Sequence, residues 1–242
     1  MSGAEFDKHA ATYDGGIDDP LKGRLGSPDD YIAVKARWLL RHEKQLKKGG
    51  LAFLDYGCGA GDLMRVLGKL GARAEFTGCD VSTGMLAEAA RRWPNARFVE
   101  QRGALTPFAD ASFDIATISA VLHHVPVDER PAVYAELARV LKPGGRLYVF
   151  EHNPRNPLVR RVIKRTPIDA EAILLDASEV RHGILAAARY EVDTAYLMFM
   201  PPGIKLLRPV DRALAWLPLG AQYVVAARKG EILWTGPPSK RN

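Results

Sequence analysis

The sequence predicts an α/β fold in which helices cover both faces of a mainly parallel sheet. Short apolar runs rich in Val, Ile and Phe alternate with longer stretches of helical periodicity, which is the pattern of βα units. Hydrophobic residues make up 47% of the chain and charged residues 26%, as in ordinary globular domains. The 242 residues fit one domain. We therefore expect a single doubly wound domain over residues 1–242.

Seven apolar runs qualify as strands of this sheet. Five of them alternate with helical patterns across the middle of the chain, and two follow near its end. The predicted strands are residues 51–55, 75–80, 97–101, 113–119, 146–151, 190–200 and 222–227.

Capping residues indicate where the intervening helices begin. Asp62, Ser82 and Asp128 each precede a helical pattern, and their side chains are of the kind that accepts hydrogen bonds from the first turn. A further helix is expected over residues 30–47, ahead of the first strand.

The chain gives no sign of a membrane span or a secretion signal. No stretch approaches the roughly 20 uncharged apolar residues that a span requires, and the N-terminus lacks the apolar run of a signal peptide. We expect a cytoplasmic protein in which Cys58 and Cys79 are reduced and packed. The formal net charge of +6 leaves nucleic acid, an acidic membrane surface or an anionic small molecule open as partners.

A glycine-rich turn at residues 54–63, Leu-Asp-Tyr-Gly-Cys-Gly-Ala-Gly-Asp-Leu, joins the first strand to a helix. Glycines there let backbone approach a ligand closely. Asp80 ends the second strand, where an acidic side chain accepts hydrogen bonds from a ribose diol. A dinucleotide site would need glycine at position 62, and Asp62 would repel a pyrophosphate. The pattern therefore favours an adenosine ligand without phosphates and argues against a dehydrogenase.

Four segments resemble, in order, the motifs of class I S-adenosylmethionine-dependent methyltransferases, and the resemblance spans nearly the whole chain. These segments are residues 54–61, 78–86, 108–125 and 139–154. Within that family the chain is similar to the small-molecule, methyltransferase-11/UbiE-like group. The resemblance implies a Rossmann-like seven-stranded sheet of order 3-2-1-4-5-7-6 with strand 7 antiparallel. It also implies S-adenosylmethionine as cofactor and S-adenosylhomocysteine as product.

The same resemblance divides the single domain. Residues 1–48 are expected to form an N-terminal lid with helices, 49–152 the cofactor-binding core, and 153–220 the acceptor pocket. The last strand is expected at 221–229 and a tail at 230–242.

The resemblance assigns cofactor binding to residues at the strand ends and in the N-terminal segment. They are Tyr13, Asp55, Gly57, Cys58, Gly59, Asp80, Val81, Met85, Gly103, Ala104 and Ser119. Three alternatives stay open, because Tyr13 could be a surface aromatic residue, Met85 ordinary helix core, and Asp55 a cap of the glycine turn. The family often has Gly-Asp after the third strand, where this chain has Gln101 and Arg102. Adenine recognition is therefore expected from backbone near Gly103 and Ala104.

Three histidines are candidates for catalysis. Methyl transfer from a sulfonium mainly needs proximity and alignment, and a general base helps only when the acceptor must lose a proton. His123 and His124 follow the fourth strand and His152 follows the fifth, with His124 and His152 the leading candidates. The alternative is that each histidine only packs or bonds a loop carbonyl. Glu151 is expected to orient a neighbour, and no metal site is expected.

Basic residues after the fifth strand suggest the acceptor. Arg155, Arg160 and Arg161 are expected to bind it, because guanidinium groups suit phosphate and carboxylate. We expect transfer to a hydroxyl or carboxylate oxygen of an anionic metabolite or sugar, although a solvated helix face is the alternative. RNA methylation and cofactor binding without catalysis stay open as alternatives. No appended RNA-binding module is visible, which argues against nucleic acid. The oligomeric state is open.

Basic and apolar residues interleave in a stripe at residues 205–220, Lys-Leu-Leu-Arg-Pro-Val-Asp-Arg-Ala-Leu-Ala-Trp-Leu-Pro-Leu-Gly. Such a stripe is expected to pack against the sheet, and the alternative is that it lies on a lipid or membrane surface.

Overall fold

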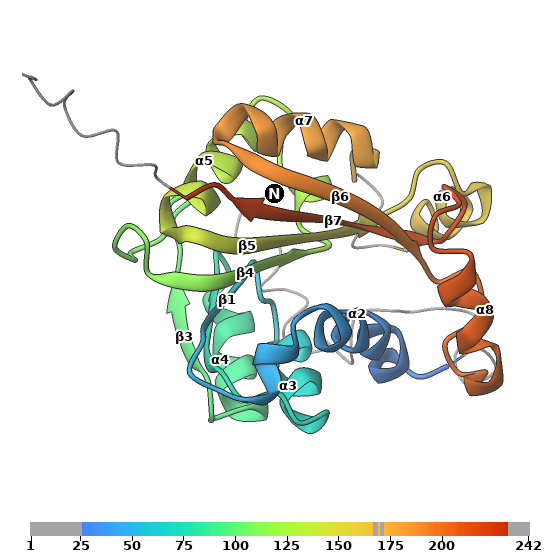
Figure 1. Cartoon of the computed structure of the whole chain (residues 1–242), viewed down its shortest axis with the longest axis horizontal. Helices are drawn as coiled ribbons and strands as arrows, with labels where there is room; N and C mark the ends of the chain where they lie inside the picture. Colours follow the sequence, from blue (N-terminus) through green and yellow to red (C-terminus); the bar gives the residue numbers. More distant parts are fainter. Residues whose placement is uncertain (1–25, 167–168, 170–171, 232–242) are drawn as a thin grey trace, which may run out of the picture.

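A computed structural model describes residues 26–166, 169 and 172–231. Its centre is one seven-stranded sheet of order β3-β2-β1-β4-β5-β7-β6 (Figure 1). The strands are β1 (Ala52–Tyr56), β2 (Glu75–Asp80), β3 (Arg97–Glu100), β4 (Phe113–Ser119), β5 (Leu141–His152), β6 (Tyr190–Leu197) and β7 (Gln222–Lys229). Neighbours in β3-β2-β1-β4-β5 are parallel, whereas β7 is antiparallel to both β5 and β6. The predicted fold class, strand order and strand direction are confirmed.

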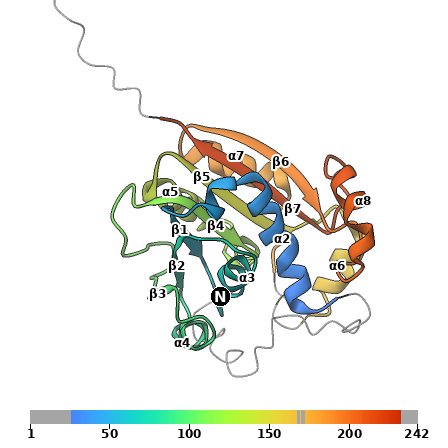
Figure 2. The same ribbon diagram turned by 60° about the horizontal axis from the view of Figure 1, so that its bottom comes forward.

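Helices cover both faces of this sheet, as Figures 1 and 2 show from two directions. The helices are α2 (Pro28–His42), α3 (Asp62–Lys69), α4 (Thr83–Arg92), α5 (Arg130–Val140), α6 (Pro157–Ile163), α7 (Ala177–Ala187) and α8 (Arg208–Ala213), with short 3-10 turns at η1 (Lys44–Lys47), η2 (Leu122–His124) and η4 (Lys205–Leu207). One buried apolar cluster joins α5 and α7 to the sheet, and a second joins α2, α3 and α4 to its other face. The two clusters hold the carboxyl ends of β1, β2, β4 and β5 at one edge.

Two predicted caps are wrong and one is confirmed. Ser82 accepts a hydrogen bond from the Met85 amide at 3.1 Å and caps α4. The N-cap of α3 is Gly61, with φ of 74°, because Asp62 is already the first helical residue. The N-cap of α5 is Glu129 and makes no side-chain cap, so Asp128 lies outside the helix.

Two element boundaries also differ from the prediction. The expected helix over 30–47 is α2 followed by the separate turn η1, and α2 begins at Pro28 with a capping box between the N-cap Ser27 and Asp30 in its first turn. Strand β5 begins at Leu141 instead of 146, because residues 142–145 continue the strand beside β4 across a register shift.

The stripe at 205–220 does not pack as expected. Helix α8 has no buried residue, and the side chains of Leu206 and Trp216 are 87% and 74% exposed. The expectation of core packing is therefore wrong for this segment. No helix in the described part of the chain is long and apolar enough to cross a membrane.

Candidate active site

The turn between β1 and α3 has the backbone that its glycines predict. Gly57, Gly59 and Gly61 have φ of 67°, 51° and 74°, a region that other residues adopt only at a cost. A Cβ at Gly57 would lie 2.5 Å from Cγ2 of Val121. The turn therefore lies directly against the segment that follows β4, and a larger side chain at Gly57 would separate them.

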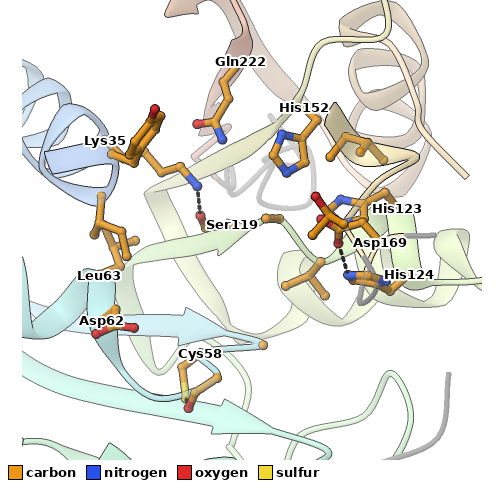
Figure 3. Close-up of a pocket in the computed structure, with 18 of the residues that line it drawn as sticks. Lys35, Cys58, Asp62, Leu63, Ser119, His123, His124, His152, Asp169 and Gln222 are labelled. Atoms are coloured by element: carbon orange, nitrogen blue, oxygen red, sulfur yellow. Dashed lines mark hydrogen bonds and ion pairs between the residues drawn. The ribbon is translucent and has the colours of Figure 1, made fainter. Parts of the chain in front are cut away.

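A cavity of about 840 Å³ opens at this edge of the sheet (Figure 3), within the size range of small-molecule sites. Ten of the residues assigned to the cofactor line it, namely Asp55, Gly57, Cys58, Gly59, Asp80, Val81, Met85, Gly103, Ala104 and Ser119. Tyr13 lies outside the described residues. His123, His124 and His152 also line the cavity, so the structure brings the cofactor and catalytic candidates together in one space.

Asp80 connects the two βα turns of the cavity. Its Oδ2 accepts a hydrogen bond from the Gly59 amide at 2.8 Å, and its Oδ1 accepts one from the Ser82 amide at 2.9 Å. Each carboxylate oxygen can accept more than one hydrogen bond, so the same group can also meet a ribose diol. Asp62 is buried beside it and is neutralised by Arg65 at 2.8 Å and Arg92 at 3.0 Å. The carboxylate at the end of β2, with no free positive group beside it for a phosphate among the described residues, fits the adenosine part of S-adenosylmethionine.

The third strand end offers an acceptor that the sequence pattern did not predict. Gln101 is buried and lines the cavity. Its amide nitrogen donates to the Gly103 carbonyl at 2.9 Å, whereas its buried Oε1 has no hydrogen-bond partner among the residues described. Arg102 is exposed and is not part of the cavity wall. Because a buried acceptor without a partner is costly, Oε1 is suited to a ligand N–H group.

A buried pair of opposite charge, Asp55 and Lys35, lies between the glycine turn and α2. The Lys35 ammonium donates to Ser119 Oγ at 2.8 Å (Figure 3), and Asp55 accepts from Thr117 Oγ1 at 2.7 Å. Burial lowers the pKa of Lys35 to about 8, although the carboxylates of Glu151 and Asp55 oppose this shift. Burial likewise raises the pKa of Asp55 to about 7, against the Thr117 hydrogen bond and the Lys35 charge.

The three histidines lie around two carboxylates. Glu151 Oε2 contacts His123 Nδ1 at 2.6 Å, and Asp169 Oδ1 lies 3.4 Å from His123 Nε2 and 3.2 Å from His124 Nε2. Burial opposes the charging of His123, yet Glu151 and Asp169 raise its pKa to about 9. Burial and the nearby His123 lower the pKa of His152 to about 4. Glu151 positions His123 and η2, as expected from the sequence.

The predicted acceptor arginines do not line the cavity. Arg160 and Arg161 are exposed, and Arg155 Nη2 pairs with Asp176 at 3.2 Å. The wall is apolar here, formed by α6 and the segment after β6. It consists of Leu158, Val159, Val162, Ile163, Met198, Phe199, Met200, Pro201 and Pro202. Lys35 is the only lysine or arginine in the cavity wall as far as the structure describes it.

Sequence reasoning missed Lys35, Gln222 and Asp169. Lys35 had a signal, because helical spacing places it near Ile32 and Leu39 on the buried face of α2. Gln222 begins β7, faces the cavity in Figure 3, and has a buried Oε1 with no partner among the described atoms. Asp169 lies in the region after the fifth strand, where the sequence pattern predicted no helix or strand.

The fold and this cavity define an enzyme class. The strand order with an antiparallel β7, the glycine turn and the acidic end of β2 together form the cofactor site of a Rossmann-like methyltransferase.

Comparisons with known proteins agree with this class. Residues 53–145 match a family described as a methyltransferase domain. The chain is 35% identical over 206 residues to 2-phytyl-1,4-naphtoquinone methyltransferase of Synechococcus elongatus, covering 82% of this chain and 81% of the relative. It is 36% identical over 156 residues to demethylmenaquinone methyltransferase of Beutenbergia cavernae, covering 62% of each. The chain belongs to the class I S-adenosylmethionine-dependent methyltransferases, and S-adenosylmethionine is its cofactor.

Solved structures show the same fold. Magnesium protoporphyrin IX methyltransferase from Synechocystis, solved with bound S-adenosylhomocysteine, superposes with a TM-score of 0.63 at 18% identity, covering 94% of this chain and 95% of that one. A methyltransferase from Archaeoglobus fulgidus gives 0.61 at 15% identity, covering 82% and 94%.

Proposed function

We propose that the enzyme methylates a small aromatic acceptor of the reduced-quinone type that carries an apolar substituent. The observation that carries this proposal is the apolar wall of α6 and residues 198–202, which faces the three histidines across one cavity. Apolar walls with a few polar groups suit an aromatic ring with hydroxyls at one edge. The names of the two relatives above, both quinone methyltransferases, support the same acceptor class.

The bound cofactor supplies a methyl group already activated by the adjacent positive sulfur. The described residues then have three tasks, which are to hold its two ends, to align the acceptor and to exclude water. The acceptor loses one proton as it gains the methyl group, whether at a ring carbon beside a hydroxyl or at the hydroxyl oxygen. We propose that His152 or His124, which line the same cavity, takes this proton, whereas His123, held between Glu151 and Asp169, positions the loop.

Two residue sets hold the cofactor in this proposal. Asp80 accepts the ribose hydroxyls, and Gln101 Oε1 accepts the adenine amino group. Asp55 and Lys35 face the two charges of the methionine end, with Asp55 attracting the ammonium and Lys35 the carboxylate. Each of these protein groups has the charge, or the hydrogen-bonding role, opposite to that of the ligand group that it meets.

Replacing Gln101 with leucine tests adenine recognition. S-adenosylhomocysteine should bind this variant about tenfold more weakly, because one hydrogen bond of about 1 to 1.5 kcal/mol is lost. S-inosylhomocysteine has no amino group at that ring position, so its affinity should not fall. Calorimetry with both ligands measures the difference, and an equal loss for both would mean that Gln101 only supports the β3 turn.

The affinity for S-adenosylhomocysteine should be highest between about pH 7 and pH 8. Asp55 faces Lys35, Asp80 and Asp62, and it loses its charge as the pH falls through its raised pKa of about 7. Lys35 faces Asp55 and Glu151, and it loses its charge as the pH rises through its lowered pKa of about 8. Calorimetry from pH 6 to 9 should show the affinity falling on both sides of this range. In Lys35→Met the fall on the alkaline side should become smaller.

An anionic acceptor methylated on oxygen was the expectation from Arg155, Arg160 and Arg161. Because these arginines lie outside the cavity wall, an acidic metabolite would find Lys35 as the only lysine or arginine among the described lining residues, and we propose that Lys35 serves the cofactor. The geometry therefore favours an uncharged ring over an anion.

A labelled methyl transfer assay tests the acceptor class. The enzyme is incubated with methyl-labelled cofactor and a 2-alkyl-1,4-naphthoquinone under reducing or oxidising conditions, beside an anionic metabolite pool and RNA. We expect label in the reduced naphthoquinone alone, and mass spectrometry identifies the methylated position. Label only in the anionic pool or in RNA, or in none of them, would refute the quinol proposal.

A further inference from the structure

Three side chains in the acceptor half of the cavity converge like metal ligands. His123 Nε2, His124 Nε2 and a carboxylate oxygen of Asp169 all lie within 4.8 Å of one another. All three residues line the cavity. They come from η2 and from the segment after α6, so the fold brings together groups 45 residues apart in sequence. Two histidines and one carboxylate form a common set for a divalent metal with an open position.

The separations between Asp169 and the two histidines are compatible with a tetrahedral metal site. Asp169 Oδ1 lies 3.2 Å from His124 Nε2 and 3.4 Å from His123 Nε2, whereas charged N–H···O bonds are usually about 2.7 to 2.9 Å. Metal–ligand bonds of about 2.0 to 2.1 Å in a tetrahedron place neighbouring ligand atoms about 3.3 to 3.4 Å apart. The two carboxylate–imidazole separations therefore match edges of a tetrahedral zinc site, and the three ligand atoms all lie within 4.8 Å of one another.

The surroundings of His123 also resemble a metal site. Glu151 Oε2 contacts the other ring nitrogen of His123 at 2.6 Å. Glu151 is itself fixed by hydrogen bonds from the amides of Val121 at 3.0 Å and Leu122 at 2.8 Å. A carboxylate behind a histidine commonly fixes the tautomer and orientation of a metal-ligating ring. With neutral imidazoles, Glu151 and Asp169 leave two negative charges that a divalent cation would balance.

We propose that His123, His124 and Asp169 bind one divalent transition metal, zinc by preference, with the open position facing the acceptor. A metal there would bind the acceptor hydroxyl oxygen and make its proton easier to lose, as a Lewis acid does. This role rests on the proposed function, whereas metal binding itself does not. The sequence expectation of no metal site is revised by this proposal.

Zinc and cobalt binding by the intact chain, without a histidine tag, tests the site. We expect about one zinc per chain after dialysis and the strong visible absorption of tetrahedral cobalt after substitution. His124→Ala and Asp169→Asn should weaken binding more than tenfold, measured by competition with a chromophoric chelator. His182→Ala changes an exposed histidine on α7 and should keep wild-type affinity. S-adenosylhomocysteine titration verifies that each variant is folded.

The outcomes separate the two proposals. Less than 0.1 zinc per chain, or equal affinity in wild type, His124→Ala and Asp169→Asn, would overturn the metal site. Zinc binding without methyl transfer to quinols would overturn the proposed acceptor class but not the metal site. Full transfer by a metal-free chain would overturn the Lewis-acid role.

A second feature, independent of the first, is an apolar and basic surface at the α6–α8 end. We call it the α6–α8 patch and define it by Leu158, Leu206, Val210, Trp216, Leu219, Arg208 and Arg212. All five apolar members are exposed. Figures 1 and 2 both place α6 and α8 at one end of the molecule, beside α2. Exposed apolar residues on elements that lie together at one end of a molecule often mark an interaction surface.

Basic side chains from α2 extend this patch. Burial lowers the pKa of Arg37 and Arg41, and the neighbouring charges of Arg208 and Arg212 respectively lower it further. The carboxylate of Asp211 is engaged by the amides of Phe199 and Met200. Positive charge beside exposed leucine and tryptophan complements an anionic lipid surface.

We infer that the α6–α8 patch docks on anionic lipid, so that an apolar acceptor enters the cavity from the bilayer. Helix α6 connects the two, because Val159, Val162 and Ile163 line the cavity while Leu158 lies at its exposed edge. The delivery step rests on the proposed function, whereas lipid binding does not.

Vesicle flotation tests this surface. The chain should float with phosphatidylcholine vesicles containing phosphatidylglycerol and remain below with pure phosphatidylcholine. Leu206→Ser with Trp216→Ser should lower the bound fraction about tenfold. Leu105→Ser with Val127→Ser changes two other exposed apolar residues, outside the patch, and should not lower it. An equal loss of the bound fraction in both double variants, or no flotation at low salt, would overturn lipid docking. So would a wild-type dimer that dissociates only in the patch variant, because the patch would then be a contact between two copies of the chain.

Discussion

Replacing Asp80 with alanine is expected to weaken S-adenosylhomocysteine binding at least a hundredfold. In the proposed site the variant loses two charge-assisted hydrogen bonds to the ribose, which together contribute about 3 kcal/mol. It also loses the bonds that join Asp80 to the amides of Gly59 and Ser82, so the glycine turn becomes less well defined. Isothermal calorimetry measures the change. 5′-Methylthioadenosine, which has the same ribose, should lose affinity to the same extent.

Two variants make the Asp80 result interpretable. Asp80→Asn keeps acceptor oxygen but removes the charge, and its affinity should lie between those of wild type and Asp80→Ala. Asp110→Ala removes an exposed carboxylate and should bind like wild type. Unchanged binding by Asp80→Ala would refute the assignment of this strand end to the ribose.

Replacing Lys35 with methionine is expected to weaken the binding of a ligand that has the amino acid end of the cofactor, but not of one that lacks it. S-adenosylhomocysteine should bind about thirtyfold more weakly, because a buried ammonium–carboxylate contact of about 2 kcal/mol is lost. 5′-Methylthioadenosine has no amino acid end, so its affinity should change less than twofold. The same calorimetry with both ligands measures the ratio. Methionine keeps most of the aliphatic stem of the buried side chain, which limits any packing loss.

The exposed Lys44→Met is the matched control on η1 and should leave both affinities unchanged. An equal loss for both ligands would mean that Lys35 only supports Ser119 and the end of β4. No loss for either ligand would exclude Lys35 from the methionine end.

Most of the sheet was predictable because its strands are short, apolar and buried. β2 and β4 match their predicted bounds, and the others differ at one or both ends. The start of β5 was missed because Pro143, Gly144 and Gly145 usually stop an element, whereas here they lie in an irregular part of the strand beside β4. The predicted cap at Asp62 was wrong because Asp62 is already the first residue of α3, and its carboxylate pairs with Arg65 and Arg92.

The cofactor half of the cavity was predictable for a different reason. Residues such as Gly57, Asp80 and Met85 lie at strand ends and helix starts, and the parallel topology brings those ends to one edge. Lys35 and Asp169 come from outside that repeating pattern, so only the three-dimensional packing of α2 and the segment after α6 places them in the cavity. The prediction that Arg160 and Arg161 bind the acceptor was wrong because the sequence does not show which face of α6 a charged side chain occupies.

The exposed stripe at α8 illustrates the same limit. Residues 205–220 have the spacing of a core helix, but β7 and β6 already close the sheet edge, and Leu206 and Trp216 remain at the surface. Periodicity indicates an apolar face, whereas its partner depends on the rest of the fold.

The most direct test of the central claim, a phosphate-free adenosine site for a methyl donor, is a calorimetric titration of the intact chain. S-adenosylhomocysteine should bind with one ligand per chain, and S-adenosylmethionine should compete for the same site. NADH and ATP should bind at least a hundredfold more weakly, because the described cavity wall offers phosphate groups no lysine or arginine other than Lys35. Tight binding of NADH or ATP, or no heat with S-adenosylhomocysteine, would contradict the account.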